Sequence, residues 1–165
     1  MTNKNTYQIQ LVDSPIGVFK TCWRDELLCR LEFSDLPASA VKDQTIDPLL
    51  KVESCTKLQR ELKQYFLGQL VHFETITAPA GTAFQLSIWH QLTQIPYGET
   101  RSYGEVARMA GNPKAARAVG MANNRNPIPI LYPCHRVIGA NGDLVGFGGG
   151  LDRKIHLLEL EKNSK

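Results

Sequence analysis

Residues 102–124 read SYGEVARMAGNPKAARAVGMANN, and this stretch decides the fold of the second half of the chain. Ser102 is followed three residues later by Glu105, which is the spacing of a helix capping box. We therefore expect a short helix over 103–109. Gly111 is typical of the residue that ends such a helix.

A second helix is expected immediately after the first. Asn112 is a good N-cap residue and Pro113 suits the first helical position, so the helix should run on over 114–124. Two short helices around so tight a turn form a candidate helix-turn-helix. The same corner occurs in many all-α cores, so this feature alone leaves DNA binding and simple core packing open.

The second of these helices combines small side chains on its surface with two projecting arginines. Its small residues are Ala115, Ala116, Ala118, Gly120 and Ala122, and its cations are Arg117 and Arg125. Small side chains would let the helix backbone approach a narrow groove closely. Tight packing between helices favours the same small residues, so both interpretations stay open.

Further helices are expected on both sides of this pair. Thr82 predicts the N-cap of a helix that ends before Pro96, and the chain closes with an amphipathic helix over 151–161. The apolar residues of that closing helix are Leu151, Ile155, Leu158 and Leu160. The chain between reads as an extended run stiffened by prolines over 126–132 and a glycine-rich stretch over 139–150.

The first half reads as a small α/β unit. Three strands of an antiparallel meander are predicted over 7–12, 18–23 and 27–33. A loop over 35–48 and a helix over 54–67 should follow them. Small residues with Pro and Gly predict a linker over 75–82. We expect an α/β N-terminal lobe over 1–80, with a small antiparallel sheet plus a helix. A mainly α C-terminal lobe over 81–165 should carry the helix-turn-helix and the loop that holds Cys134.

Composition and charge are those of an ordinary globular protein. Of the 165 residues 42% are hydrophobic and 21% charged, which argues against disorder. The formal net charge of +3 is modest, but it divides into −1 over 1–80 and +4 over 81–165. A polyanionic partner should therefore meet the second half.

The four cysteines are Cys22, Cys29, Cys55 and Cys134. They include no Cys-x-x-Cys pair, which excludes a zinc ribbon and a disulfide mini-scaffold. The polar N-terminus does not resemble a secretory signal, and no apolar run is long enough to span a bilayer. We expect a cytoplasmic protein that makes no membrane contact and keeps its thiols reduced.

Cys134 is the cysteine that has a histidine beside it. His135 could act as the base that converts the thiol to the nucleophilic thiolate, and Arg136 adds positive potential. In a straight strand, however, neighbouring side chains point to opposite faces. Cooperation therefore needs a turn at Cys134 or a bridging water. The alternative is a small buried cysteine next to a structural histidine.

The sequence resembles the O6-alkylguanine-DNA alkyltransferases, the methylated-DNA–protein-cysteine methyltransferases. The resemblance covers about residues 81–162, with motifs in the same order and spacing. These motifs are Ile95–Glu99, Ser102-Tyr103, Gly111–Gly120, Asn126-Pro127, Pro133–Val137, Gly149–Leu151 and Leu157-Leu158 followed by Glu161. In the first half the similarity is weaker and lies mainly at Asp13–Gly17.

The resemblance implies a reaction centred on Cys134, which would accept the alkyl group from O6 of guanine. His135 would be the base, acting through a bridging water, and Glu161 would orient it. The family's spacing selects Glu161, which the residues alone do not distinguish from Glu159, and Glu159 is left as a solvated residue. Asn126 would tie the helix-turn-helix to the active-site strand.

The resemblance also implies how the damaged base is reached, since O6 lies inside the base stack. Arg117 would enter the stack in place of the flipped nucleotide, and Tyr103 would crowd the target phosphate and bind the base. The second helix would lie in the minor groove, which gives little sequence readout and suits its alanine-rich surface. Pro129, Val137 and Gly148 would line the base pocket, with backbone carbonyls of Cys134 and Val137 accepting from the guanine amino group.

No cofactor is expected, because the thiolate displaces guanine directly and the resulting thioether cannot be hydrolysed back. Each molecule should act once, as a monomer, on double-stranded DNA containing O6-alkylguanine. We expect no metal: some members bind zinc in the first lobe, but the matching positions here include Asn5, Arg24 and Cys29, at most a partial ligand set.

Three alternatives remain open at this point. A cysteine hydrolase would use Cys134, His135 and Glu161 over many turnovers. An alkyltransferase-like binding module would only recognise alkylated DNA, although such proteins lack the cysteine. A transcriptional regulator would use the helix-turn-helix and would ordinarily require a dimer interface.

Gly148 generates a first prediction, because some relatives have serine there. The run Gly148–Gly150 should loosen the active-site loop, and the pocket should therefore accept alkyl groups larger than methyl. Single-turnover rates on duplexes carrying O6-methylguanine and O6-benzylguanine measure this. Transfer of methyl with no transfer of benzyl would contradict the prediction.

Overall fold

The computed structural model describes residues 7–43 and 53–164. The chain falls into two compact units, Met1–Pro79 and Ala80–Lys165, and each is described by itself.

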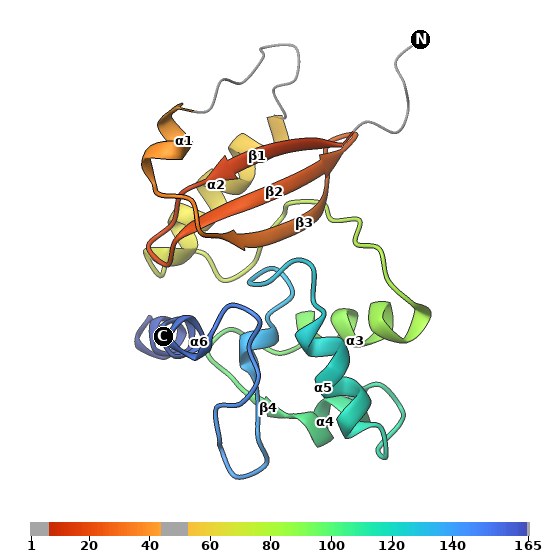
Figure 1. Ribbon diagram of the computed structural model, residues 1–165. Helices are drawn as coiled ribbons and strands as arrows, with labels where there is room; N and C mark the ends of the chain where they lie inside the picture. The colour runs from red at the N-terminus through yellow and green to blue at the C-terminus, as the bar shows by residue number, and fades with distance from the viewer. Residues whose placement is uncertain (1–6, 44–52, 165) are drawn as a thin grey trace. The chain divides into compact units, whose positions relative to one another are not determined.

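The first unit is built on a three-stranded antiparallel sheet (Figure 1). Its strands are β1 (Gln8–Val12), β2 (Val18–Arg24) and β3 (Leu27–Ser34), in the order β1-β2-β3. The expected meander is thus confirmed. The pairing of β2 with β3 shifts register between Cys22 and Trp23, which marks a bulge.

A helix, α2 (Glu53–Phe66), covers one face of this sheet (Figure 1). It buries Cys55, Leu58, Leu62 and Tyr65, and Cys55 Sγ lies 4.0 Å from Thr21 Oγ1 of β2. The helix expected over 54–67 is confirmed. The loop expected over 35–48 is partly wrong, because residues Ser39–Asp43 form a short helix, α1. This helix begins with local turns, in which the backbone N–H groups of Ala40 and Val41 donate to the carbonyls of Pro37 and Ala38. Residues 44–48 of that expected loop lie outside the described part.

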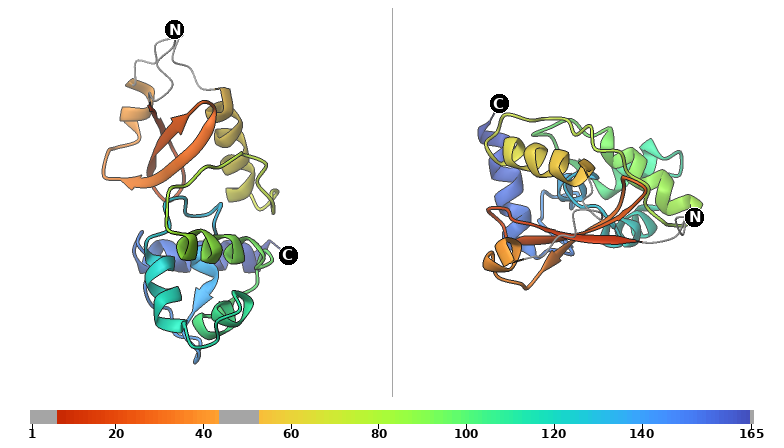
Figure 2. Two further views of the ribbon diagram at one scale, coloured as in Figure 1. Left: turned by 90° about the vertical axis from the view of Figure 1, so that its right-hand side faces the viewer. Right: turned by 90° about the horizontal axis from the view of Figure 1, so that it is seen from above.

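The second unit packs helices around one short strand pair (Figure 2). Its elements are α3 (Ala83–Thr93), β4 (Arg101–Ser102), α4 (Tyr103–Met109), α5 (Ala116–Asn124), the 3-10 turn η2 (Cys134–Arg136), β5 (Val137–Ile138) and α6 (Leu151–Asn163). β4 and β5 pair in parallel. The apolar core takes residues from α3, α4 and α5, together with Cys134 and Val137.

The α3 and α4 helices both begin at the capping residues that the sequence predicts. Thr82 and Gln85 form a capping box at the start of α3, and Ser102 and Glu105 form another at the start of α4. The α3 helix is tied to α5 by Trp89, whose Nε1 donates to Ala122 O at 2.9 Å.

The predicted start of the second helix of the helix-turn-helix is wrong. The α5 helix begins at Ala116, and Ala115 is its N-cap. Gly111 and Asn112 instead end α4, since their N–H groups donate to Arg108 O and Ala107 O in the manner of a Schellman motif. A further turn follows, in which Ala115 N donates to Asn112 O, and it delays the new helix.

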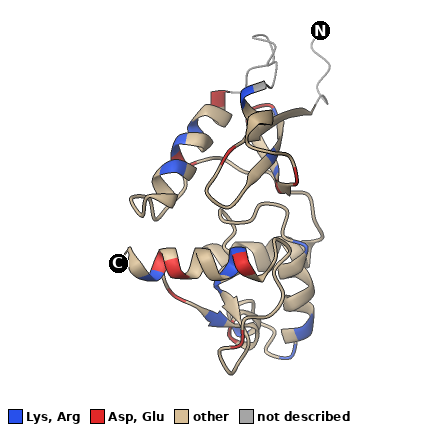
Figure 3. Cartoon of the chain, turned by 60° about the vertical axis from the view of Figure 1, so that its left-hand side comes forward, with Lys and Arg blue, Asp and Glu red and all other residues tan. Residues whose placement is uncertain are grey.

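The expected apolar face of the closing helix is also wrong. Leu151 and Ile155 are exposed, whereas α6 buries Lys154, Leu157 and Glu161. Both charged residues on the buried face have hydrogen-bond partners there, and these partners replace the apolar contacts that the pattern predicts. Figure 3 shows acidic and basic residues along α6.

Candidate active site

Cys134 lies at the turn between an extended run and a short strand. Its backbone N–H donates to Tyr132 O at 2.7 Å, and Arg136 N donates to Pro133 O at 3.0 Å as the chain coils into η2. Cys134 and His135 are therefore not neighbours in a straight strand. The turn that their cooperation requires is present.

The Cys134 thiol is buried, with 4% of the residue exposed. Burial raises the pKa of this thiol to about 11, although a hydrogen bond with Asn126 and the charge of Lys154 act in the opposite direction. Since the thiolate is the nucleophile, a base must remove the proton during any reaction at this sulfur.

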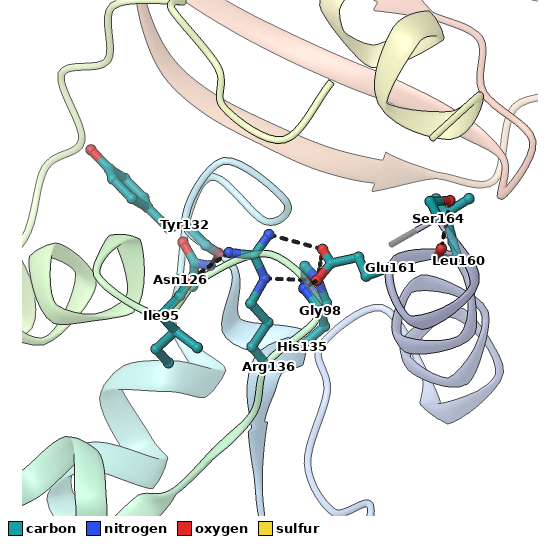
Figure 4. Close-up of polar contacts among 9 residues, drawn as sticks. All are labelled: Ile95, Gly98, Asn126, Tyr132, His135, Arg136, Leu160, Glu161 and Ser164. Carbon is teal, nitrogen blue, oxygen red and sulfur yellow. Dashed lines mark hydrogen bonds and ion pairs between the residues drawn. The ribbon is translucent and has the colours of Figure 1, made fainter. Parts of the chain in front are cut away.

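His135 is a buried imidazole held by a carboxylate. Its Nε2 lies 2.7 Å from Glu161 Oε1 (Figure 4). The carboxylate accepts, so Nε2 is the donor and Nδ1 is left as an acceptor. Nδ1 is buried and has no hydrogen-bond partner among the residues that the structure describes. Burial lowers the pKa of His135 more than Glu161 raises it, which leaves the ring neutral and able to accept a proton.

Glu161 has no exposed surface, and donors from two other segments meet its carboxylate. Besides His135, Arg136 Nε and Nη2 donate to it at 2.8 and 2.9 Å, and Gly98 N donates at 3.0 Å (Figure 4). Burial alone would raise the pKa of Glu161. The hydrogen bond from His135 and the guanidinium of Arg136 outweigh burial and hold the pKa well below its usual range.

Arg136 is more than the source of positive potential that its position in the sequence indicates. It is 7% exposed, and its Nη1 donates to Ile95 O at 2.6 Å. Its guanidinium carbon lies 5.7 Å from the centre of the Tyr97 ring. Sequence reasoning missed this ion pair because nothing in the sequence shows that Arg136 is buried.

Two more polar residues next to Cys134 were missed. Lys154 is fully buried in α6, and its Nζ donates to Val137 O at 2.6 Å and Val145 O at 2.9 Å. Asn123, buried in α5, donates from Nδ2 to Cys134 O at 3.3 Å. The spacing of seven residues between Lys154 and Glu161 was a usable signal, since it places both on one helix face.

Asn126 follows α5 and precedes the cysteine turn in the chain. Its Nδ2 donates to Tyr132 O at 2.7 Å, and its Oδ1 accepts from Ile128 N at 3.0 Å. The side chain thus joins the beginning of the extended run to its end and fixes the approach to Cys134.

Tyr103, the first residue of α4, contacts the glycine-rich loop. Its hydroxyl donates to Val145 O at 3.0 Å. A Cβ built on Gly146 would lie 3.6 Å from that hydroxyl, and one on Gly120 would lie 3.7 Å from the tyrosine ring. Gly120 therefore faces Tyr103, which is the helix-packing interpretation of this glycine.

The exposed side of α5 carries the cations. Arg117 and Arg125 are exposed, whereas Ala115, Ala116 and Ala118 are partly buried around the buried Val119.

The residues expected to line a base pocket differ in exposure. Pro129 is buried and forms a bridge with Tyr132, and Val137 has no exposed surface. Gly148 is exposed, and a Cβ there would lie 3.7 Å from Asn124 O, which is ordinary contact.

No cluster of three or more His, Cys, Asp or Glu residues that could hold a metal occurs in 7–43 and 53–164. Within the same ranges no helix has the length and apolar character needed to cross a membrane. Asn5, considered as a zinc position, lies outside the described residues.

The chain resembles known proteins over nearly its whole length. A family model for the 6-O-methylguanine DNA methyltransferase DNA-binding domain matches residues 83–163. A methylated-DNA–protein-cysteine methyltransferase of Methanosarcina acetivorans is 48% identical over 157 residues, which cover 92% of this chain and 96% of that relative. One from Mycobacterium leprae is 47% identical over 92% of this chain and 90% of its own. The chain belongs to the methylated-DNA–protein-cysteine methyltransferase family.

Solved structures of this methyltransferase family share the fold. The O6-methylguanine methyltransferase of Mycobacterium tuberculosis matches with a TM-score of 0.83 and 43% identity, over 97% of this chain and 95% of that one. A crystal structure of the M. tuberculosis protein in complex with DNA matches with a TM-score of 0.82 and 45% identity, over 94% and 93%. The two-lobe fold expected from the sequence is therefore confirmed.

The Glu161 carboxylate yields a second prediction. Glu161→Gln leaves the buried Arg136 without its counter-charge, so the free energy of unfolding should fall by about 3 kcal/mol at neutral pH. Chemical denaturation of both proteins measures the difference.

Glu159→Gln is the matched control, because Glu159 is an exposed residue of the same helix. It should change the free energy of unfolding by no more than about 0.5 kcal/mol. Equal effects of the two substitutions would contradict the assigned role of the ion pair.

Proposed function

We propose that this protein repairs O6-alkylguanine in double-stranded DNA by irreversible transfer of the alkyl group to Cys134. The observation that carries the proposal is the buried Cys134 thiol next to a neutral His135 whose Nε2 is held 2.7 Å from Glu161. Membership in the methyltransferase family supports the same reaction.

The residues around Cys134 account for each part of the transfer. His135 Nδ1 takes the thiol proton through a bridging water, while Glu161 stabilises the imidazolium that forms. The sulfur–carbon bond forms as the bond from carbon to O6 breaks. The guanine anion that leaves takes up one proton and becomes guanine. The Asn126 side chain and the Lys154 charge both favour the thiolate, since each opposes the effect of burial on the thiol pKa.

The product explains why the protein would act once. A thioether is stable to water, and the transfer regenerates no thiol. The protein would therefore be consumed in a one-to-one reaction that needs no cofactor. A cysteine hydrolase built on the same residues would turn over many times.

We assign DNA recognition to residues 81–165, the half with the positive excess. α5 would enter the minor groove with its surface of Ala115, Ala116 and Ala118, where readout of sequence is weak. Gly120 would instead let α5 pack closely on Tyr103. Arg117 would take the place of the flipped nucleotide, and Arg125 would contact the backbone. This placement suits a protein that must find damage in any sequence.

The flipped base would lie between Tyr103 and the cysteine turn. Pro129, Val137 and Gly148 would line its pocket, with the Gly148 N–H donating to O6. The Tyr103 hydroxyl, which donates to Val145 O in the free protein, would exchange that partner for the base. We further propose that the protein acts as a monomer in the cytoplasm, where a reducing environment keeps Cys134 a thiol.

The proposal predicts one alkyl group on one residue. After incubation with a duplex containing O6-methylguanine, mass spectrometry of peptides should find a single added methyl group on the Cys134 peptide, at one per molecule. Cys134→Ser should accept none, because a serine hydroxyl is far harder to ionise.

Cys22→Ser is the matched control, since Cys22 lies in the first unit and should leave the stoichiometry at one. Multiple turnover would favour the hydrolase. An unmodified Cys134 peptide in a protein that still binds the duplex would favour a binding module or a regulator.

Arg117 provides a further prediction. Arg117→Ala should slow repair of duplex DNA by about tenfold or more, because the flipped-out state loses the side chain that fills the stack. Reaction with free O6-benzylguanine base should change less than about twofold, since no flipping is involved.

The control for this charge is Arg30→Ala, an exposed arginine of the first unit. It should leave both rates near those of the unmodified protein. Equal loss of both reactions in Arg117→Ala would contradict the flipping role.

A further inference from the structure

Asn123 is a buried polar residue that the reaction described above does not use. It belongs to α5 and is 3% exposed, and its Nδ2 donates to Cys134 O at 3.3 Å. Its Oδ1 is also buried and has no hydrogen-bond partner within 7–43 and 53–164. A buried acceptor left unpaired costs free energy, so its presence beside the reactive cysteine calls for a ligand that donates to it.

The hydrogen bond to Cys134 fixes which way the amide faces. A backbone carbonyl can only accept, so the atom directed at Cys134 O is the amide nitrogen. Oδ1 is bonded to the same carbon as Nδ2. The Asn123 Oδ1 acceptor therefore lies close to the Cys134 backbone, because it belongs to the amide group that donates to Cys134 O. It is supplied by α5 and not by the cysteine turn.

The substrate of the proposed reaction has one suitable donor. When O6 of guanine carries an alkyl group, N1 loses its hydrogen, and the exocyclic 2-amino group is the N–H donor left on that edge of the base. The amino group and O6 lie on the same edge, with N1 between their two ring carbons. With the alkylated O6 at the Cys134 sulfur, the resemblance implies that the amino group meets the backbone carbonyls of Cys134 and Val137. Cys134 O already accepts from Asn123 Nδ2, and Val137 O already accepts from Lys154 Nζ. Asn123 Oδ1 is the unpaired acceptor beside the Cys134 backbone among the described residues, so it can take one of the two amino hydrogens in place of Cys134 O.

An alkylated thymine offers no such donor. In O4-alkylthymine N3 has lost its hydrogen, and the position that corresponds to the 2-amino group holds the oxygen O2. That oxygen would face the Asn123 oxygen as a second acceptor. A buried acceptor opposite another acceptor disfavours the complex, whereas a donor there favours it.

We propose that Asn123 Oδ1 accepts a hydrogen bond from the 2-amino group of the flipped O6-alkylguanine and sets the preference for guanine over thymine. Asn123 is then a specificity-determining residue of the base pocket. The inference rests on the proposed function, because it needs the flipped base at Cys134.

The test removes the donor and the acceptor separately. Single-turnover rates are measured on duplexes with O6-methylguanine, with O6-methylhypoxanthine, which lacks the 2-amino group, and with O4-methylthymine. The proteins are the unmodified chain, Asn123→Ala and Asn123→Leu. The rate ratio of O6-methylguanine to O6-methylhypoxanthine should fall by about fivefold in both variants. The rate ratio of O6-methylguanine to O4-methylthymine should fall in the same two variants.

The ratio is insensitive to partial misfolding. Each molecule reacts once, so the amplitude counts the active molecules and the rate constant describes only those. Asn124→Ala is the matched control, because it makes the same change at the next, exposed position of α5. It should keep the ratio of the unmodified protein.

The outcomes separate the inference from the proposed function. An unchanged ratio in both Asn123 variants, with all substrates slowed equally, would mean that Asn123 only supports the Cys134 backbone. That result, or an increased ratio, would overturn the inference. An unmodified protein that takes no methyl group from O6-methylguanine would overturn the proposed function, and this inference with it.

Discussion

The buried carboxylate of Glu161 is the constraint on which the second unit depends. A charge without exposed surface is tolerated only when hydrogen bonds and a counter-charge satisfy it. Here His135 and Arg136 donate from the cysteine turn and Gly98 from the segment before β4. The same bonds that stabilise the carboxylate therefore fix the position of α6 relative to η2. They also give the imidazole its tautomer, with Nδ1 free to accept a proton.

The reactive cysteine gains a fixed position from this arrangement and no intrinsic reactivity. Burial raises the pKa of the Cys134 thiol to about 11, while burial lowers the pKa of His135. At rest the pair is neutral, and the proton moves only when a substrate carbon is present. Such a site would resist oxidation and adventitious alkylation better than an exposed thiolate, which suits a protein that reacts once.

The sequence alone predicted much of this, and the failures have physical causes. Periodicity and capping residues predicted the meander, α2, α3 and the start of α4, because these signals are local. The start of α5 was misplaced because Asn112 serves the end of α4. The ion pair of Arg136 and the role of Lys154 were missed because the burial of both residues depends on contacts between distant segments. Choosing Glu161 over Glu159 required the family resemblance, since both are acidic residues of one helix.

The central claim is that His135, and not solvent hydroxide, takes the proton from Cys134. The measurement that tests it most directly is the pH profile of single-turnover methyl transfer from duplex O6-methylguanine. With a thiol pKa of about 11 and a His135 pKa below its usual value, the rate constant should be flat from about pH 7 to about pH 9. A rate constant that rises tenfold per pH unit over that interval would show that the thiolate forms without His135, and would contradict the account.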